Sequence, residues 1–299
     1  MKIKRGCVIV NAYAEDENYL YQARRMKTEF EKLGAECDIV KNSALSVKIC
    51  DETVAAFSGY DFAVFWDKDK YLLSALEKIG VKTFNNRRAI ELCDDKVLTY
   101  IALSGEGLPL AKTIPAPLCY TAGAKESDAA VDGIIAELGL PLIVKEAYGS
   151  LGKGVYLAKD GEELKKLSAE LIYKPHLYQK YISSSKGKDI RLIAVGNRVL
   201  GAMQRISDGD FRSNIGAGGR ATIYEPTKEM IDITLKAKKI LGLDYCGIDL
   251  LSGENGEPII CEVNSNAFFS AFESVTHVNV AEAYAGYVLN NCDNQGKRT

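Results

Sequence analysis

The hydrophobic pattern of this chain changes character along its length, and this change limits the folds that it can adopt. From Gly6 to about Asn86, short apolar runs alternate with stretches of helical periodicity. Gly6–Asn11 and Asp61–Trp66 are typical of strands, and Asn18–Leu33, closed by Gly34, is typical of a helix. This alternation predicts a small parallel α/β domain. No GxGxxG pattern follows the first strand, so the dinucleotide fingerprint is absent.

The middle of the chain mixes helices and strands less regularly. Arg87–Gly107 is expected to form one helix, and the prolines that follow it indicate a connector with an edge strand at Lys112–Ala116. Helices are then expected at 127–138 and 161–169, and strands at 141–147, 155–158 and 177–182. This region is therefore predicted to be an α+β unit.

The last third of the chain is expected to contain two hairpins. One pairs Asp189–Val195 with Arg198–Ile206, and the other pairs Cys246–Leu251 with Pro258–Val263. A helix at Thr227–Leu241 lies between them. The expected fold is thus α/β in its first part and α+β in the rest. We expect three domains, spanning residues 1–92, 93–182 and 183–299.

Composition narrows the class of protein. The 299 residues include 38 Lys and Arg against 40 Asp and Glu, which gives a net charge of -2. Such a chain has no overall field for nucleic acid or an anionic membrane, so neither is expected as a partner. No apolar stretch is as long as a signal-peptide core or a membrane span, so the expected location is the cytoplasm. Eight scattered cysteines and two histidines leave little material for a zinc site or a Ser-His-Asp triad.

The second hairpin brings three oxygen-bearing side chains to one face. Glu262 and Asn264 share a face because side chains alternate along a strand. A turn centred on Gly253–Pro258 places Asp249 opposite Glu262, roughly 5 Å away. Carboxylate and amide oxygens suit Mg²⁺ or Mn²⁺, which usually also bind substrate phosphates. A solvated polar face is the alternative, but Asp249 lies among apolar residues, where a carboxylate needs a partner.

A glycine-rich turn follows the strand at 141–147. Gly149, Gly152 and Gly154 allow backbone N–H groups to close over an anion, and Lys145 adds a positive charge. The pattern predicts a flap over phosphate groups, with an ordinary hairpin turn as the alternative. It is not a Walker A loop, because Ala147 stands where that motif has its first glycine.

A polar segment after the first hairpin carries two arginines. Arg205 and Arg212, with Ser213 and Asn214, offer forked donors, a hydroxyl and an amide. Such groups recognise phosphate or carboxylate. Polar glycine-rich loops are common, so the loop alone is weak evidence for an anion site.

The order of these motifs resembles that of the ATP-grasp superfamily. The matching elements are Asp95-Lys96, Lys145 with Gly149 to Val155, Gln179 to Ile182, Asp189-Ile190-Arg191, Asp210 to Asn214, Gly247-Ile248-Asp249 and Glu262-Val263-Asn264. The string Asp210-Phe211-Arg212-Ser213-Asn214 and the triplet Asp189-Ile190-Arg191 resemble the RimK-like branch of amino-acid and glutamate ligases. The resemblance runs from about Arg87 to Leu289. It implies an ATP-grasp fold behind an N-terminal parallel α/β pre-ATP-grasp domain.

The resemblance also implies roles for the matching residues. Nucleotide binding falls to Lys96, Lys145, Gly149, Ser150, Gly152, Gly154, Lys180, Tyr181, Asp189, Arg212, Ser213 and Asn214. Within this set, Lys145 would contact the ATP phosphates, the glycine-rich turn would close as a lid, and Lys180 and Tyr181 would form the hinge beside adenine. The catalytic residues implied are Arg205, Arg212 and Asn214, with Arg191 as a further contact to carboxylate or phosphate. Asp249, Glu262 and Asn264 would hold two Mg²⁺ ions, or Mn²⁺ in their place.

The implied function is that of an ATP-dependent carboxylate-amine ligase, which forms an amide through an acyl phosphate and releases ADP. Its partners would be ATP, an amino acid such as glutamate or another amine, and an acid on a peptide, cofactor, small molecule or carrier protein. The resemblance is also compatible with a homo-oligomer. The segment 265–269 departs from the small-Pro-Gly turn frequent in the branch and is expected to line the acceptor site. Two alternatives stay open, a nucleotide-binding regulatory protein without turnover and a ligase for a carrier-bound substrate.

Overall fold

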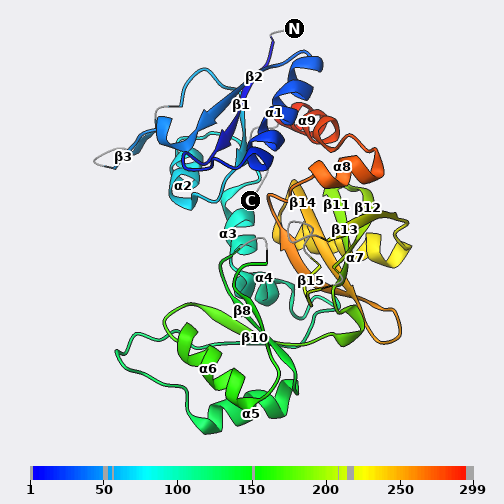
Figure 1. The fold of residues 1–299 in the computed structure, drawn as a ribbon. Coiled ribbons are helices and arrows are strands. Elements are labelled where there is room, and N and C mark those ends of the chain that lie inside the picture. Colours follow the sequence, from blue (N-terminus) through cyan, green and yellow to red (C-terminus); the bar gives the residue numbers. More distant parts are fainter. Residues whose placement is uncertain are drawn as a thin grey trace.

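The computed structural model describes residues 3–49, 53–55, 57–149, 152–207, 209–213 and 219–293. These residues form three main sheets and a short hairpin, and helices pack on the sheets (Figure 1). The mixed α/β fold predicted from the sequence is confirmed. None of the helices in these ranges is long and apolar enough to cross a membrane.

The N-terminal sheet, called sheet A, is parallel. Its strands are β1 (Arg5–Val10), β2 (Glu36–Lys41), β5 (Phe62–Trp66) and β6 (Thr83–Phe84), in the order β2-β1-β5-β6. The helices α1 (Glu17–Lys32) and α2 (Lys70–Lys78) connect these strands, as does a segment with a 3₁₀ turn, η1 (Asn42–Ala44), and a small hairpin of β3 (Val47–Ile49) and β4 (Thr53–Ala55). The parallel sheet was predicted, whereas the β3–β4 hairpin was not.

Short polar side chains fix where the helices begin. Backbone N–H groups in the first turns of eight helices donate hydrogen bonds to the side-chain oxygens of the N-cap residues Asp16, Asp69, Asn86, Asp95, Ser127, Asp160, Thr227 and Asn279. Such caps satisfy donors that the helix itself leaves unpaired. The one helix predicted over Arg87–Gly107 is wrong for this reason. It is two helices, α3 (Arg87–Asp94) and α4 (Lys96–Leu103), because Asp95 is extended and caps α4.

The central sheet, called sheet D, is antiparallel. Its strands are β7 (Thr113–Pro115), β8 (Leu142–Glu146), β9 (Val155–Ala158) and β10 (His176–Lys180), in the order β7-β10-β8-β9. The helices α5 (Asp128–Leu138) and α6 (Gly161–Leu171) cover one face and share a separate apolar cluster with the sheet. The glycine-rich turn joins β8 to β9.

The C-terminal sheet, called sheet C, contains both predicted hairpins. Its strands are β11 (Lys188–Val195), β12 (Arg198–Ile206), β13 (Arg220–Tyr224), β14 (Tyr245–Ser252) and β15 (Pro258–Asn264), in the order β13-β12-β11-β14-β15. The 3₁₀ turn η2 (Ser183–Ser185) precedes the sheet, and the helices α7 (Lys228–Leu241), α8 (Ser270–Thr276) and α9 (Val280–Asn291) accompany it.

Sheets A and C share an apolar core, although they lie far apart in the sequence. One buried cluster includes Phe30 and Phe62 of the first part of the chain together with Tyr245, Phe269 and Tyr284 of the last part. Helix α9, near the end of the chain, packs beside α1, near its start (Figure 1). Each main sheet lies within one of the three segments 1–92, 93–182 and 183–299, and the division into those domains stays a proposal.

Candidate active site

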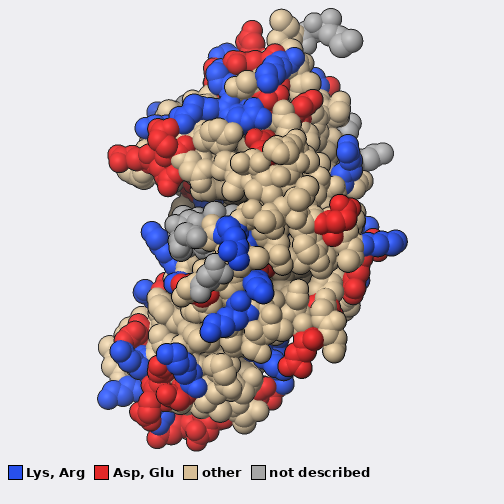
Figure 2. Space-filling view, turned by 45° about the vertical axis from the view of Figure 1, so that its right-hand side comes forward, with Lys and Arg blue, Asp and Glu red and all other residues tan. Residues whose placement is uncertain are grey.

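A cavity of about 540 Å³ lies where the three main sheets meet. Sheet A contributes residues that follow its strands, α4 contributes Lys96, sheet D contributes Lys145 and Gln179, and sheet C contributes its polar face. Figure 2 shows basic side chains around the indentation at mid-height of the molecule, whereas acidic side chains gather mostly toward its ends. Most of the predicted site residues line this cavity. They are Lys96, Lys145, Gly152, Lys180, Tyr181, Asp189, Arg205, Arg212, Ser213, Asp249, Glu262 and Asn264.

The three oxygen-bearing side chains predicted to share a face of the second hairpin do share it, and this face is called the metal face below after its predicted role, but the turn differs from the prediction. Asp249 pairs with Glu262, and Gly247 pairs with Asn264. The turn lies one position away from the predicted centre, since Ser252 pairs with Pro258, and a β-bulge at Cys261 restores the register. The hydroxyl of Tyr100 in α4 lies 3.1 Å from the carbonyl oxygens of Ile260 and Cys261 and holds the bulge.

Charges on this face are paired across neighbouring strands. Arg191 on β11 donates from Nε and Nη2 to the two oxygens of Asp249, at 2.7 Å each. Arg205 on β12 lies 2.9 Å from Asp249 Oδ2 and also forms a forked pair with Asp189. These pairs follow the register, because Asp189 lies opposite Arg205 and Arg191 lies opposite Asp249. The result is an alternating row of charges across three strands, in which Asp189, Arg205 and Asp249 are buried and Arg191 is half-buried.

The two acids in this row have different electrostatic surroundings. Burial opposes ionisation of Asp249, but Arg191 and Arg205 outweigh it and hold the pKa of this carboxyl well below its usual range. Burial raises the pKa of Asp189, as does the charge of Asp249, while Arg205 and the Ser213 hydroxyl oppose that shift. Of these two acids, Asp249 is therefore the one whose ionised form its neighbours favour.

The donor set of Asp249, Glu262 and Asn264 fits a hard divalent cation. Among the described residues, no three His, Cys, Asp or Glu side chains gather as a metal site, and this set has only two of that kind plus an amide. An ionised carboxyl has about four lone-pair sites, and the arginines use three on Asp249. Among the described residues, the Glu262 carboxylate forms one ion pair, with Lys96 Nζ at 3.3 Å. Oxygens thus remain for Mg²⁺, the hard ion that such ligands favour.

The glycine-rich turn and Lys145 form the facing wall. Lys145 is buried at the end of β8, with Nζ 3.8 Å from Cys261 Sγ. Burial opposes its charge, but Cys261, Tyr100 and Glu262 raise the pKa of Lys145 above its ordinary value. Lys96 Nζ donates to the Gly149 carbonyl at 2.9 Å and so links the turn to Glu262. Gly152 and Gly154 have φ near +74° and +72°, a conformation that glycine adopts readily, whereas Ser150 lies outside the described residues.

The loop that carries Arg212 and Ser213 contacts the glycine-rich turn. Arg212 donates from Nη1 to the Gly152 carbonyl at 2.9 Å and forms an ion pair with Asp210. Ser213 donates to Asp189. Asn214 lies outside the described residues. Two predicted phosphate-binding segments, far apart in sequence, are therefore in contact.

The family of this chain follows from comparison with known proteins. The protein-family model of the RimK-like ATP-grasp domain matches residues 93–288. The chain belongs to the RimK-like ATP-grasp family. Human beta-citrylglutamate synthase B is 37% identical over 223 residues, which cover 74% of this chain and 56% of that protein. Human N-acetylaspartylglutamate synthase A is 34% identical over 231 residues, or 77% of this chain and 58% of that protein. The chain thus spans little more than half the length of these relatives.

Further comparisons place the fold of this RimK-like chain. The glutamate–LysW ligase ArgX of Sulfolobus acidocaldarius is 35% identical over 228 residues, covering 74% of this chain and 77% of that protein. The RimK domain ATP-grasp protein of Sphaerobacter thermophilus superposes with a TM-score of 0.72 at 18% identity, over 95% of this chain and 99% of that one. The D-alanine–D-alanine ligase of Bacillus anthracis complexed with ATP gives 0.73 at 18% identity, over 98% and 100%. The predicted ATP-grasp fold is confirmed.

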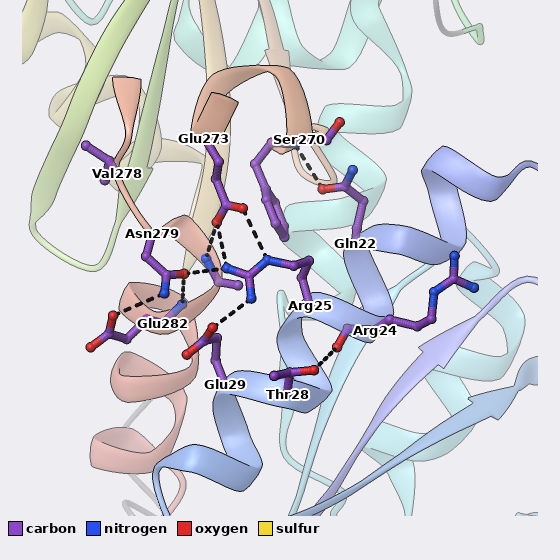
Figure 3. A network of polar contacts seen from close by, with 12 residues as sticks. Gln22, Arg24, Arg25, Thr28, Glu29, Ser270, Glu273, Val278, Asn279 and Glu282 are labelled. Atoms are coloured by element: carbon purple, nitrogen blue, oxygen red, sulfur yellow. Dashed lines mark hydrogen bonds and ion pairs between the residues drawn. The ribbon is translucent and has the colours of Figure 1, made fainter. Parts of the chain in front are cut away.

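The segment that follows the metal face in this RimK-like chain is held by the N-terminal part. Asn85 Nδ2 donates to the Ser265 carbonyl at 2.9 Å, and the Phe269 N–H donates to Gln22 Oε1 at 3.0 Å. Figure 3 shows the adjacent network, in which Arg25 of α1 reaches Glu273 of α8 and Asn279 at the start of α9. These contacts fix a segment of which Ser265, Asn266, Ala267 and Phe268 line the cavity, and its expected place at the acceptor site stays a prediction.

Sequence reasoning missed several cavity residues. Asn11 and Asp67 line the cavity directly after β1 and β5, and Cys261 lines it from the bulge. The signal for the first two was available, because a polar residue directly after a buried parallel strand lies at the edge where ligands bind. Cys261 had no such signal, since a bulge leaves no clear mark in the sequence.

Proposed function

We propose that this chain is an ATP-dependent carboxylate-amine ligase that forms an amide bond and releases ADP and phosphate. One observation carries the proposal: a single cavity is lined both by the oxygens of Asp249, Glu262 and Asn264 and by the basic wall of Lys145 and Lys96. An oxygen-rich metal face opposite a basic glycine-rich turn suits a nucleotide triphosphate with its metal ions.

The reaction has two balanced steps. An oxygen of the acid attacks the terminal phosphorus of ATP, the bond to the β-phosphate oxygen breaks, and ADP leaves. The amine nitrogen then attacks the acyl carbon, the bond to phosphate breaks, and the amine loses a proton. No protein nucleophile is needed, so the residues contribute positioning and charge stabilisation.

Residues in different parts of the cavity are proposed to have different roles. Lys145 and the glycine-rich turn would hold the phosphates, Arg205 and Arg212 would stabilise the transferred group, and Tyr181 beside Lys180 would border the base. The Tyr181 hydroxyl is buried without a hydrogen-bond partner among the described residues, which leaves it available to a ligand. Asp249, Glu262 and Asn264 would hold two Mg²⁺ ions, or Mn²⁺, which neutralise charge on the phosphates.

The substrates are proposed from the names of the relatives. Three of them are named for products or reactions that include glutamate, so glutamate is the proposed amine. The acid is proposed to be a small polycarboxylate or an acidic group on a peptide or carrier. The segment at 265–269, held by α1 and Asn85, is the part of the cavity proposed to select the acid.

An ADP-release screen tests the function. Purified protein with Mg-ATP is offered each amino acid with citrate, N-acetylaspartate or an acidic peptide, and wild type is compared with Glu262→Gln. The expected result is ADP release that requires both an acid and an amine, together with hydroxamate formation when hydroxylamine replaces the amine. ATP binding without any amine-dependent turnover would favour the regulatory alternative instead. A mass increase on a carrier protein would identify a carrier-bound substrate.

A further inference from the structure

We propose that Asp67 binds the ammonium group of the amino acid that acts as the amine substrate, at the end of the cavity formed by sheet A. This inference rests on the proposed ligase function and assigns one of its substrates to a place. The metal face and the glycine-rich turn lie on the other walls of the cavity.

The topology of sheet A favours ligand binding at the end of the cavity where Asp67 lies. In the order β2-β1-β5-β6, the chain leaves β1 to one side to form β2 and returns to the other side to form β5. Asn11 follows β1 and Asp67 follows β5, so the two residues stand on either side of the point where the strand order reverses. In open α/β sheets, ligands bind outside the carboxyl ends of the strands at this point. Both residues line the cavity.

The charge of Asp67 lacks a compensating cation. The residue is only 7% exposed, and its carboxylate accepts from Asn11 Nδ2 at 3.2 Å, Asn42 Nδ2 at 2.9 Å and the Lys68 N–H at 2.7 Å. All three donors are neutral. Among the described residues, Asp67 forms no ion pair, and the Lys68 ammonium lies 2.7 Å from Asp94 instead.

An uncompensated buried carboxylate is costly, and a ligand can supply the missing charge. Buried charges in proteins are normally paired, since their removal from water is unfavourable. The neutral donors hold the carboxylate in place without cancelling its charge. A bound ammonium would do so, and it would gain a partially desolvated ion pair of the kind that recognises amines.

The charged residues of the cavity come from different elements, and Lys68, which also lines it, is paired with Asp94. Lys96, Lys145 and Arg212 line the part beneath the glycine-rich turn, where a polyanion fits. Asp67 lies at the end formed by sheet A, and Asn266, which donates from Nδ2 to the Asp67 carbonyl at 2.9 Å, joins that end to the segment after Asn264. An amine bound at Asp67 therefore lies in the same cavity as Asp249, Glu262 and Asn264.

Binding of amino acids to the Asp67→Asn variant tests the inference without turnover. The twenty amino acids are titrated calorimetrically into wild type in the presence of Mg²⁺ and a non-hydrolysable ATP analogue. Asp67→Asn should weaken binding of the preferred amino acid at least about tenfold, the factor for a lost contact of 1.4 kcal/mol.

Asp69→Asn is the matched control. Asp69 lies on the same turn and loses the same charge, but it does not line the cavity. Its carboxylate caps α2 by accepting from the Leu72 N–H, a role that asparagine also fills. The control should bind the amino acid within about twofold of wild type.

Kinetics separate the ammonium subsite from a structural role. Asp67→Asn should raise KM for the amino acid and leave KM for ATP and for the acid within about twofold. Hydroxylamine is largely uncharged near neutral pH, so its conversion to hydroxamate should be nearly unchanged. A uniform fall with both nucleophiles, or equal amino-acid affinity in wild type and Asp67→Asn, would overturn the proposal.

A second variant covers the case in which Asp67→Asn does not fold. Ala14→Lys places a cation at the same end of the cavity and leaves the hydrogen bonds of Asp67 intact, since Ala14 lines the cavity and takes no part in them. It should also weaken amino-acid binding, and unchanged binding would contradict the inference. If wild type binds an amino acid through Asp67 yet releases no ADP, the ligase function fails and the subsite stands. If wild type binds none of the twenty, the subsite fails.

Discussion

The two walls of the cavity are built in different ways. On sheet C, Asp189, Arg205, Asp249 and Arg191 form buried pairs between neighbouring strands, and Asp249 is only 3% exposed. The wall formed by sheet D contacts the opposite side of the cavity through single hydrogen bonds, such as the one that Arg212 Nη1 donates to the Gly152 carbonyl. Sheet D also has its own apolar cluster, whereas sheets A and C share one.

This difference separates a face held by ion pairs from a wall that is held by fewer contacts. Paired charges inside one sheet hold their geometry before substrates arrive, which is the condition for electrostatic stabilisation of a transition state. A wall with few contacts can open and close over a nucleotide at small cost. We therefore expect substitutions on sheet C to change both stability and turnover, and substitutions on the glycine-rich turn to change mainly nucleotide binding.

The largest effect is expected from Asp249→Ala. It removes the acid between Arg191 and Arg205 and leaves two cations without their shared partner. The free energy of unfolding should fall by about 3–5 kcal/mol, as when a buried ion pair is broken. Turnover should fall by about 10³-fold. Urea unfolding and ADP release measure the two effects, and near-normal values for either would contradict a pre-organised charged face.

Glu262→Gln should separate chemistry from stability on the same face. Glu262 is partly exposed and contacts Lys96 at 3.3 Å, so unfolding should change by less than about 1 kcal/mol. Turnover should still fall by about 10²-fold or more, because a metal-facing carboxylate is lost. A loss of stability as large as that of Asp249→Ala would remove the distinction between the two residues.

Lys145→Met tests the facing wall. Methionine has a similar length and is apolar, so the buried position should tolerate it with little loss of stability. KM for ATP should rise about 10–100-fold, as expected for losing a charged contact of 1.5–3 kcal/mol. Steady-state kinetics at saturating acid and amine give this value, and an unchanged KM for ATP would show that Lys145 does not face the nucleotide.

The smallest effect is expected from Gly154→Ala, with Gly34→Ala as its control. Both glycines have positive φ, of 72° and 83°, so alanine should cost about 1–2 kcal/mol at either position. A Cβ at Gly154 would also lie 3.0 Å from the Glu146 side chain, whereas one at Gly34 meets nothing within 4 Å. Only Gly154→Ala should change KM for ATP, by a few fold. Equal kinetics for the two variants would argue against a role for the turn.

Local sequence patterns predicted much of the fold and part of the site. The parallel character of sheet A and both hairpins of sheet C followed from short-range patterns, and the pairing of Asp249 with Glu262 followed from an assumed turn centre. The predicted turn centre was nevertheless wrong, and the bulge at Cys261 compensated for it. The break between α3 and α4 had a local signal that was overlooked, since Asp95 is a favoured cap residue.

The rest of the site depends on contacts between distant segments. The pairing of Asp249 with Arg191 and Arg205 exists because β11 lies between β12 and β14, an order that no local pattern encodes. The contact of Arg212 with Gly152 likewise joins two loops from different sheets. Local patterns identified Asp249, Arg205, Arg212 and Gly152 as candidates, the resemblance added Arg191, and only the fold brings them together.

The fate of the carboxylate oxygen tests the central claim most directly. Acid labelled with ¹⁸O in its carboxyl group is incubated with enzyme, Mg-ATP and the amine, and the products are analysed by mass spectrometry. If Asp249, Glu262 and Asn264 bind the metal ions at the terminal phosphates, as proposed, one labelled oxygen appears in inorganic phosphate and ADP is the nucleotide product. Labelled AMP together with pyrophosphate would contradict the account, because attack would then occur at the α-phosphate.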